Sequence, residues 1–116
     1  MKFYYNGQLV RTSKTHEYKY AVMVEGSKKP FACCSRYDLA QKQMQTYISS
    51  DDNIMKFYEK AIKLLNEGKT SYRDEYGYKI VLDKSLEYYQ EHLEHCKKFR
   101  EWAIANTKIV ELEMRA

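Results

Sequence analysis

A six-residue polar segment, residues 11–16, carries the side chains best suited to hold an anion. It offers two cations, three hydroxyls and an imidazole, and it contains no apolar side chain. Arg11 and Lys14 can pair with phosphate, the arginine in a bidentate manner. The neutral donors are the hydroxyls of Thr12, Ser13 and Thr15. The segment therefore predicts either a solvated loop or a contact surface for a phosphorylated ligand.

Three residues outside this segment extend the predicted site. Arg36 lies at the expected start of a helix, where backbone N–H groups favour anions. Arg100 and Asn106, near the end of a long predicted helix, are candidates for a site between subunits. The predicted ligand-binding residues are Arg11, Thr12, Ser13, Lys14, His16, Arg36, Arg100 and Asn106.

Tyrosine is unusually frequent, with twelve among 116 residues. A tyrosine ring near the polar segment could stack on a nucleobase, a contact worth roughly 1–3 kcal/mol per base. The candidates are Tyr4, Tyr5, Tyr18, Tyr20 and Tyr72. For each tyrosine taken alone, packing in the core or the sheet is the alternative role, because the ring suits half-buried positions.

Positive charge is concentrated near the N-terminus. Residues 1–36 hold seven Lys and Arg against two Glu, whereas the remainder holds thirteen basic against fourteen acidic residues. This imbalance indicates a local surface that attracts anions, although such charges can also serve only to keep sheet edges soluble. A long nucleic acid would favour a broader basic stripe. The modest excess therefore favours a small nucleotide over single-stranded nucleic acid.

Signals for catalysis are weak. His16, with Lys14 and Tyr18, could support acid–base chemistry on a phosphodiester, but the spacing offers no second acid–base group. The chain has four glycines and neither a P-loop nor a dinucleotide fingerprint. We therefore predict a binding protein rather than an enzyme.

Metal binding and disulfide formation are not predicted either. His92, His95 and Cys96, completed by Cys33 or Cys34, could in principle hold zinc. Their spacing matches no common zinc motif, and Cys96 falls on an apolar stripe, where a free thiol packs as a small hydrophobe. The three cysteines are an odd number, and the simplest explanation is that they are reduced thiols in a cytosol. We expect no metal and no cofactor.

The hydrophobic periodicity predicts one α+β domain over residues 1–116. An N-terminal antiparallel β-meander is expected first, then two helices, a strand, a long C-terminal helix and a final strand. Asn6-Gly7, between apolar runs, is typical of a two-residue hairpin turn with positive φ at both positions. Gly68 is expected just after the second helix, where a C-terminal glycine belongs.

The expected boundaries follow from turn and capping residues. Strands are predicted at residues 2–6, 8–13, 16–24, 31–34, 78–82 and 109–114, with a loop or ragged hairpin arm at 69–77. Ser35, with Asp38 three residues on, is expected to cap the first helix. The second helix begins after a break at residues 49–53, and the long helix runs from Ser85 to about Asn106.

The long helix has a wider apolar surface than one stripe requires. Tyr88, Trp102 and Ile104 lie off its main face, which predicts a partner helix or a second subunit. The alternative is a helix buried on two sides. No stretch approaches the roughly 18 apolar residues of a membrane helix, and no signal peptide is expected.

The stretch YYNGQLVRTSKTHEYKYAV (residues 4–22), followed by CCSRYDLAQ (residues 33–41), resembles the start of a family of small proteins encoded by phages and mobile elements of Firmicutes. The ending, a long helix and then KIVELE, fits the same likeness. Within that group the chain resembles the anti-Thoeris sponge proteins of phages in its length, its β-rich N-terminal part and its long C-terminal helix.

This resemblance implies a non-enzymatic function in the cytoplasm of a bacterial host. Such proteins bind and sequester cyclic ADP-ribose-type signals made by TIR-domain enzymes, and some also hold cyclic di- or trinucleotides of CBASS defence. They assemble as homo-oligomers, with ligands bound between protomers.

Three function classes stay open. A nucleotide-signal sponge retains small cyclic nucleotides without turnover. A phage accessory protein that binds single-stranded nucleic acid, or inhibits a host defence nuclease, predicts a marked salt dependence if nucleic acid is the target. An enzyme acting on a phosphodiester predicts product formation that is lost on His16→Ala.

Overall fold

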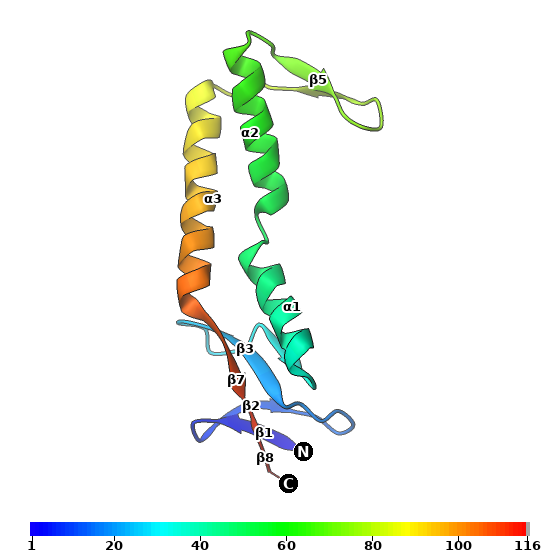
Figure 1. Ribbon diagram of the computed structural model, residues 1–116, viewed down its shortest axis with the longest axis vertical. Coiled ribbons are helices and arrows are strands. Elements are labelled where there is room, and N and C mark those ends of the chain that lie inside the picture. Colours follow the sequence, from blue (N-terminus) through cyan, green and yellow to red (C-terminus); the bar gives the residue numbers. More distant parts are fainter. Residues whose placement is uncertain (116) are drawn as a thin grey trace. The chain divides into compact units, whose positions relative to one another are not determined.

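The computed structural model describes residues 1–115, which form eight strands and three helices (Figure 1). The strands are β1 (Lys2–Tyr5), β2 (Gln8–Thr12), β3 (Tyr20–Val24), β4 (Ala32–Cys34), β5 (Ser71–Arg73), β6 (Lys79–Val81), β7 (Thr107–Glu111) and β8 (Glu113–Arg115). The helices are α1 (Tyr37–Ile48), α2 (Asp52–Asn66) and α3 (Leu86–Asn106). The α+β class is confirmed, with antiparallel strands first and a long helix near the C-terminus.

The chain divides into two compact units. Unit 1 consists of Met1–Ser50 and the segment from Glu101 onward, and unit 2 is Asp51–Arg100. Unit 1 contains β1 to β4, α1, the end of α3, and β7 and β8. Unit 2 contains α2, the β5–β6 hairpin and the larger part of α3.

Unit 1 has two three-stranded antiparallel sheets, and each combines strands from both ends of the chain. One has the order β2-β1-β8 and the other β4-β3-β7. The predicted N-terminal strands are present, and they divide between these two sheets. After α3 the chain returns to the N-terminal strands, where β7 pairs with β3 and β8 pairs with β1 (Figure 1).

The turn between β1 and β2 has the predicted backbone. Asn6 has φ of 50° and Gly7 has φ of 76°. Asparagine and glycine adopt this left-handed region more readily than other residues, since the short polar side chain and the missing Cβ avoid the usual clash. The turn fixes the register of the first hairpin, in which Tyr5 pairs with Gln8.

The core of unit 1 lies on one face of the second sheet, against α1. Val22, Cys34 and Ala40 are its buried residues. Partly buried neighbours are Tyr20, Ala32, Leu39, Met44 and Ile109. Side chains alternate along a strand, so the register partners Met23 and Lys108 share the opposite face of this sheet.

Unit 2 is held by a second cluster, formed by the buried residues Ala61, Leu82 and Tyr89. At the end of α2, Gly68 has φ of 77°, and its N–H donates to the carbonyl of Leu65. The N–H of Lys69 donates to the carbonyl of Leu64, which completes a Schellman motif and confirms the role predicted for Gly68.

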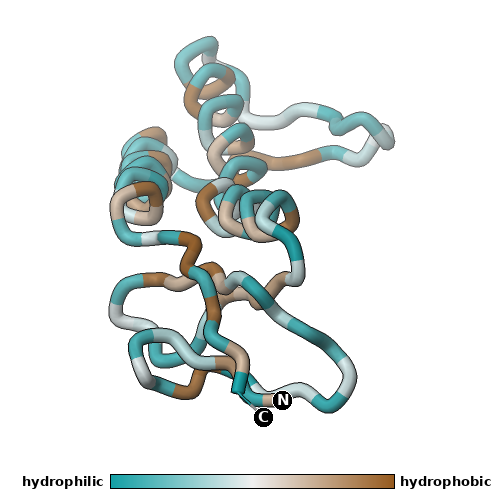
Figure 2. Tube along the Cα trace, turned by 60° about the horizontal axis from the view of Figure 1, so that its bottom comes forward, coloured by the Kyte–Doolittle hydropathy of each residue, from teal (hydrophilic) through white to brown (hydrophobic). Residues whose placement is uncertain are grey.

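The helices alternate hydrophilic and hydrophobic residues along their length (Figure 2). At the start of α3, the hydroxyl oxygen of Ser85 accepts the N–H of Tyr88 at 3.1 Å, as an N-terminal cap does. In the described part of the chain, no helix combines the length and the apolar character needed to cross a membrane.

Several predicted boundaries differ from the structure. The strand expected from His16 begins only at Tyr20, because the preceding residues form a turn around the Ser13 hydroxyl. Residues 69–82 form a complete hairpin, β5–β6. The last strand is split at Leu112, whose N–H donates to the carbonyl of Lys19 in the register of the β3–β7 pair, before β8 begins at Glu113 and pairs with β1.

The start of α1 also differs from the expectation. Arg36, not Ser35, is the N-cap residue, and its side chain makes no capping hydrogen bond. Its backbone is extended, and its carbonyl accepts the N–H of Ala40. Asp38 lies in the first turn, as predicted, but its carboxylate pairs with the Arg36 guanidinium at 3.2 Å.

Candidate functional site

The polar segment predicted to hold an anion forms an ordered loop after β2. The hydroxyl oxygen of Ser13 accepts the N–H of His16 at 2.9 Å and the N–H of Thr15 at 3.3 Å. The Ser13 backbone is bound to Met1 by two hydrogen bonds, at 2.9 and 3.0 Å. The Ser13 hydroxyl therefore shapes the loop.

Tyr18 brings two of the predicted ligand residues together. The guanidinium carbon of Arg11 lies 4.9 Å from the centre of the Tyr18 ring. The imidazole of His16 stacks on the same ring, with centroids 5.9 Å apart and planes 14° apart. Phe3 meets Tyr18 edge-on at 5.4 Å, which ties the cluster to β1. Thr12 and Lys14 are exposed beside this cluster.

Cys33 lies next to Arg11. Burial raises the pKa of the Cys33 thiol above its ordinary value, and the Arg11 guanidinium opposes that effect. Burial also raises the pKa of Cys34, as does the neighbouring Cys33. Thiols with a raised pKa stay protonated near neutral pH and are poor nucleophiles.

The predicted arginines outside the loop are both paired with carboxylates. Arg36 pairs with Asp38 at the start of α1, as described above. Arg100 belongs to unit 2, where its guanidinium lies 2.8 Å from the carboxylate of Asp52. Arg100 thus belongs to a different unit from the other predicted ligand residues, and its role in a site between subunits stays a prediction.

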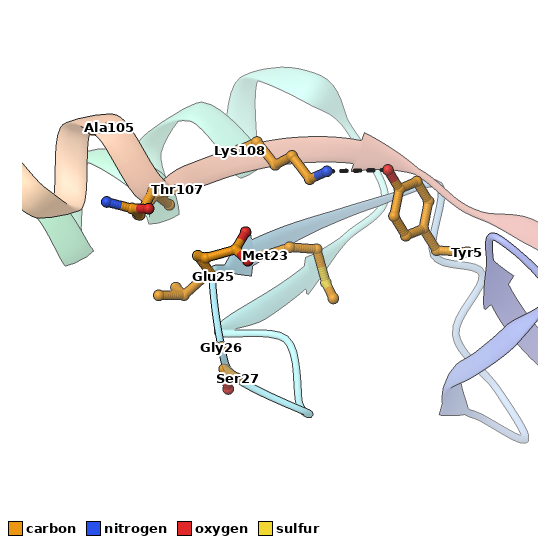
Figure 3. Close-up of a pocket in the computed structure, with 10 residues that line it drawn as sticks. Tyr5, Met23, Glu25, Gly26, Ser27, Ala105, Thr107 and Lys108 are labelled. Atoms are coloured by element: carbon orange, nitrogen blue, oxygen red, sulfur yellow. Dashed lines mark hydrogen bonds between the residues drawn. The ribbon is translucent and has the colours of Figure 1, made fainter.

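A cavity of unit 1 lies elsewhere, where the end of α3 and the start of β7 meet β1 and β3 (Figure 3). Its volume is about 250 Å³, and it is open to solvent. It is lined by Tyr5, Met23, Val24, Glu25, Gly26, Ser27, Ala105, Asn106, Thr107 and Lys108. Of the predicted ligand residues, Asn106 is the one that lines it.

One end of this cavity carries two hydrogen-bond donors, the Lys108 ammonium and the Tyr5 hydroxyl. The ammonium of Lys108 donates to the hydroxyl oxygen of Tyr5 at 3.2 Å and lies 5.3 Å from the centre of the Tyr5 ring (Figure 3). Within residues 1–115, Lys108 makes no ion pair, so the remaining N–H groups of its ammonium are available to a ligand. Because Tyr5 accepts from Lys108, its own O–H is free to donate.

The other end of the cavity presents acceptors. The carboxylate of Glu25 lines it and forms no ion pair within residues 1–115. The side-chain N–H of Asn106 donates to the carbonyl of Trp102 at 2.8 Å, which leaves its amide oxygen as an acceptor. The hydroxyl of Ser27 donates to the carbonyl of Lys29 at 2.9 Å, so the lone pairs of its oxygen stay available to accept a hydrogen bond.

Net charge favours unit 1 as the unit that attracts anions. Unit 1 holds ten Lys and Arg against six Asp and Glu, whereas unit 2 holds ten of each. Among the described residues, no three His, Cys, Asp or Glu side chains gather closely enough to hold a metal ion. The Lys108 ammonium and the Tyr5 hydroxyl are the groups of the cavity suited to hydrogen-bond an anion.

Sequence reasoning missed most of this cavity. Tyr5 was considered as a stacking residue, but Lys108 and Glu25 were not considered as ligand contacts. The one available signal was the position of Glu25 and Asn106 at the ends of predicted elements, since functional groups often gather at such ends.

No protein family, no curated protein and no solved structure matches the chain.

Proposed function

We propose that the protein is a non-catalytic binding protein that captures and sequesters small cyclic nucleotide signals in the cavity of unit 1. The observation that carries the proposal is the Lys108–Tyr5 pair, in which an ammonium that makes no ion pair within residues 1–115 contacts an aromatic ring and its hydroxyl at the cavity. In a nucleotide, the ammonium can bind the phosphate and the aromatic ring can stack on the base, so the pair suits both parts of the ligand.

The cavity volume sets the size of the captured unit. At about 250 Å³ it lies just below the range of roughly 300–1,000 Å³ that is usual for drug-sized ligands. It suits one nucleotide unit, with the rest of a cyclic ligand outside. The phosphate binds the Lys108 ammonium and the Tyr5 hydroxyl, and the base lies between the Tyr5 ring and the Met23 side chain.

The geometry suits retention. Lys108 stands on β7 of one sheet of unit 1 and Tyr5 on β1 of the other, and their hydrogen bond positions both side chains before a ligand arrives. Preorganised groups lower the ordering cost of binding, and a sponge needs slow release rather than turnover. The Arg11–Tyr18–His16 cluster adds positive charge to the same unit, which favours the encounter with an anion.

The finer form of the proposal rests on the resemblance of residues 4–22 and 33–41 to the phage sponge family. In that form the protein acts in the cytoplasm of an infected bacterium, evades immune signalling, assembles as a homo-oligomer and takes cyclic ADP-ribose isomers or cyclic oligonucleotides. Binding of single-stranded nucleic acid or inhibition of a defence nuclease is the alternative.

A ligand-recovery experiment tests the proposal. The purified protein is incubated with cyclic ADP-ribose isomers and cyclic oligonucleotides, freed of unbound ligand, heat-denatured, and the released compounds are identified by mass spectrometry. Recovery of an intact ligand in stoichiometric amount supports sequestration. A hydrolysed product would instead identify an enzyme, and an empty protein would redirect the search to DNA, RNA and host proteins.

A further inference from the structure

We infer that the cavity selects guanine over adenine, and that Glu25 is the specificity-determining residue. The inference deepens the proposed function and rests on it. Its basis is the hydrogen-bond polarity of the cavity, which has the Lys108 ammonium and the Tyr5 hydroxyl as donors at one end and the Glu25 carboxylate as an acceptor at the other.

The acceptor end is defined by three side chains whose hydrogen-bonding capacity can be counted. An ionised carboxylate only accepts, so Glu25 offers two acceptor oxygens. The Ser27 hydroxyl donates to the carbonyl of Lys29, and one of the two side-chain N–H groups of Asn106 donates to the carbonyl of Trp102. Each side chain therefore presents an acceptor oxygen to a ligand, and Asn106 also keeps one N–H donor. The carbonyls at the C-terminal end of α3 carry partial negative charge and add to the same polarity.

A ligand that fits this end must bring donors. The pairing edge of guanine carries two adjacent donors, N1–H and the 2-amino group, which match the two oxygens of a carboxylate. Adenine and cytosine each place one amino donor beside a ring nitrogen that only accepts, and that lone pair would oppose the carboxylate. Uracil has one N–H between two carbonyl oxygens. Guanine is therefore the standard base whose edge complements Glu25.

The donor end fixes the orientation of the bound nucleotide. The Lys108 ammonium and the Tyr5 hydroxyl attract the phosphate, and the base then points toward Glu25 along the wall formed by Met23. Figure 3 shows Lys108 and Tyr5 together on one side of the cavity, and Glu25 and Ser27 on the side away from Tyr5. Among the ligands that the proposed function allows, guanine-bearing cyclic oligonucleotides are thus preferred over adenine-bearing rings.

The test compares cyclic di-GMP, cyclic di-AMP and cyclic di-IMP by isothermal titration calorimetry, using the full chain. Cyclic di-IMP keeps N1–H and lacks the 2-amino group, so it isolates one of the two donors. The wild type should bind cyclic di-GMP roughly ten- to hundredfold more tightly than cyclic di-AMP, with cyclic di-IMP between them. Glu25 is exposed, so substitution there leaves the fold intact.

The decisive variant is Glu25→Gln, because an amide pairs one acceptor and one donor, as adenine requires. It should lose affinity for cyclic di-GMP and gain affinity for cyclic di-AMP. Glu17→Gln, an equal charge change in the same unit outside the cavity, should keep the wild-type preference. Equal binding of all three ligands, or an unchanged preference in Glu25→Gln, would overturn the guanine inference alone. Failure of all three to bind would also overturn the guanine inference, and the proposed function would fall with it only if the ligand-recovery experiment likewise returned no cyclic ADP-ribose isomer and no cyclic oligonucleotide.

Discussion

The ammonium of Lys108 in β7 donates a hydrogen bond to the hydroxyl oxygen of Tyr5 in β1, at 3.2 Å, and so joins the two sheets of unit 1. Tyr5→Phe removes this acceptor and keeps the ring. We expect ligand affinity to fall roughly ten- to hundredfold, because a hydrogen bond to a charged group is worth about 1.5–3 kcal/mol, while the melting temperature changes little. Tyr37→Phe, an exposed tyrosine of α1, is the control and should bind as the wild type does. Equal losses in both variants would contradict a specific role for Tyr5.

Two serines at predicted helix starts allow a matched stability test. Ser85→Ala removes a cap whose oxygen accepts the N–H of Tyr88, and it should lower the free energy of unfolding by about 1 kcal/mol. Ser35→Ala should have almost no effect, because α1 has no side-chain cap at its start. Chemical denaturation followed by circular dichroism measures both. A larger loss at Ser35 would show that the first helix is capped as its sequence suggests.

Thr107 is a site where a substitution should stabilise the protein. Its hydroxyl oxygen is buried and has no hydrogen-bond partner among the described residues. Thr107→Val keeps the β-branched shape suited to a strand and removes the unsatisfied group, so the free energy of unfolding should rise by about 1 kcal/mol. The matched change in an exposed strand position, Thr12→Val, should be nearly neutral. Destabilisation by Thr107→Val would mean that the hydroxyl is bonded in solution.

Arg11 should control the ionisation of Cys33. Burial raises the pKa of this thiol and Arg11 lowers it, so removal of the guanidinium should move the pKa still higher. In a Cys34→Ala background, the pH midpoint of iodoacetamide labelling at Cys33 should rise in Arg11→Met. The midpoint, unlike the rate at one pH, does not depend on how fast the reagent reaches the thiol. An unchanged midpoint in Arg11→Met would show that Arg11 does not affect the ionisation of Cys33.

The parts of the fold that could be predicted are those set by local chemistry. Asn6-Gly7 specifies its turn through the positive φ of both residues, and Gly68 ends α2 for the same reason. Ser85 starts α3 because its side chain reaches an N–H three residues away. None of these needs knowledge of the distant chain.

The cavity could not be predicted in this way. Lys108 and Tyr5 are 103 residues apart in the chain, and their contact depends on the pairing of β7 with β3 and of β8 with β1. A shift of one residue in either register would turn Lys108 to the other face. The polar segment at residues 11–16 was conspicuous, but its Ser13 hydroxyl is occupied by local hydrogen bonds, and composition does not reveal that.

The most direct test of the central claim compares Lys108→Ala with Lys42→Ala in the ligand-recovery experiment. Both variants remove one positive charge from unit 1, so they weaken its long-range attraction for anions equally, but only Lys108 lines the cavity within the described chain. Our account predicts that Lys108→Ala loses about tenfold or more in retention, the effect expected of one charge-assisted hydrogen bond, and that Lys42→Ala retains ligand as the wild type does. Equal retention by the two variants would contradict nucleotide capture in this cavity.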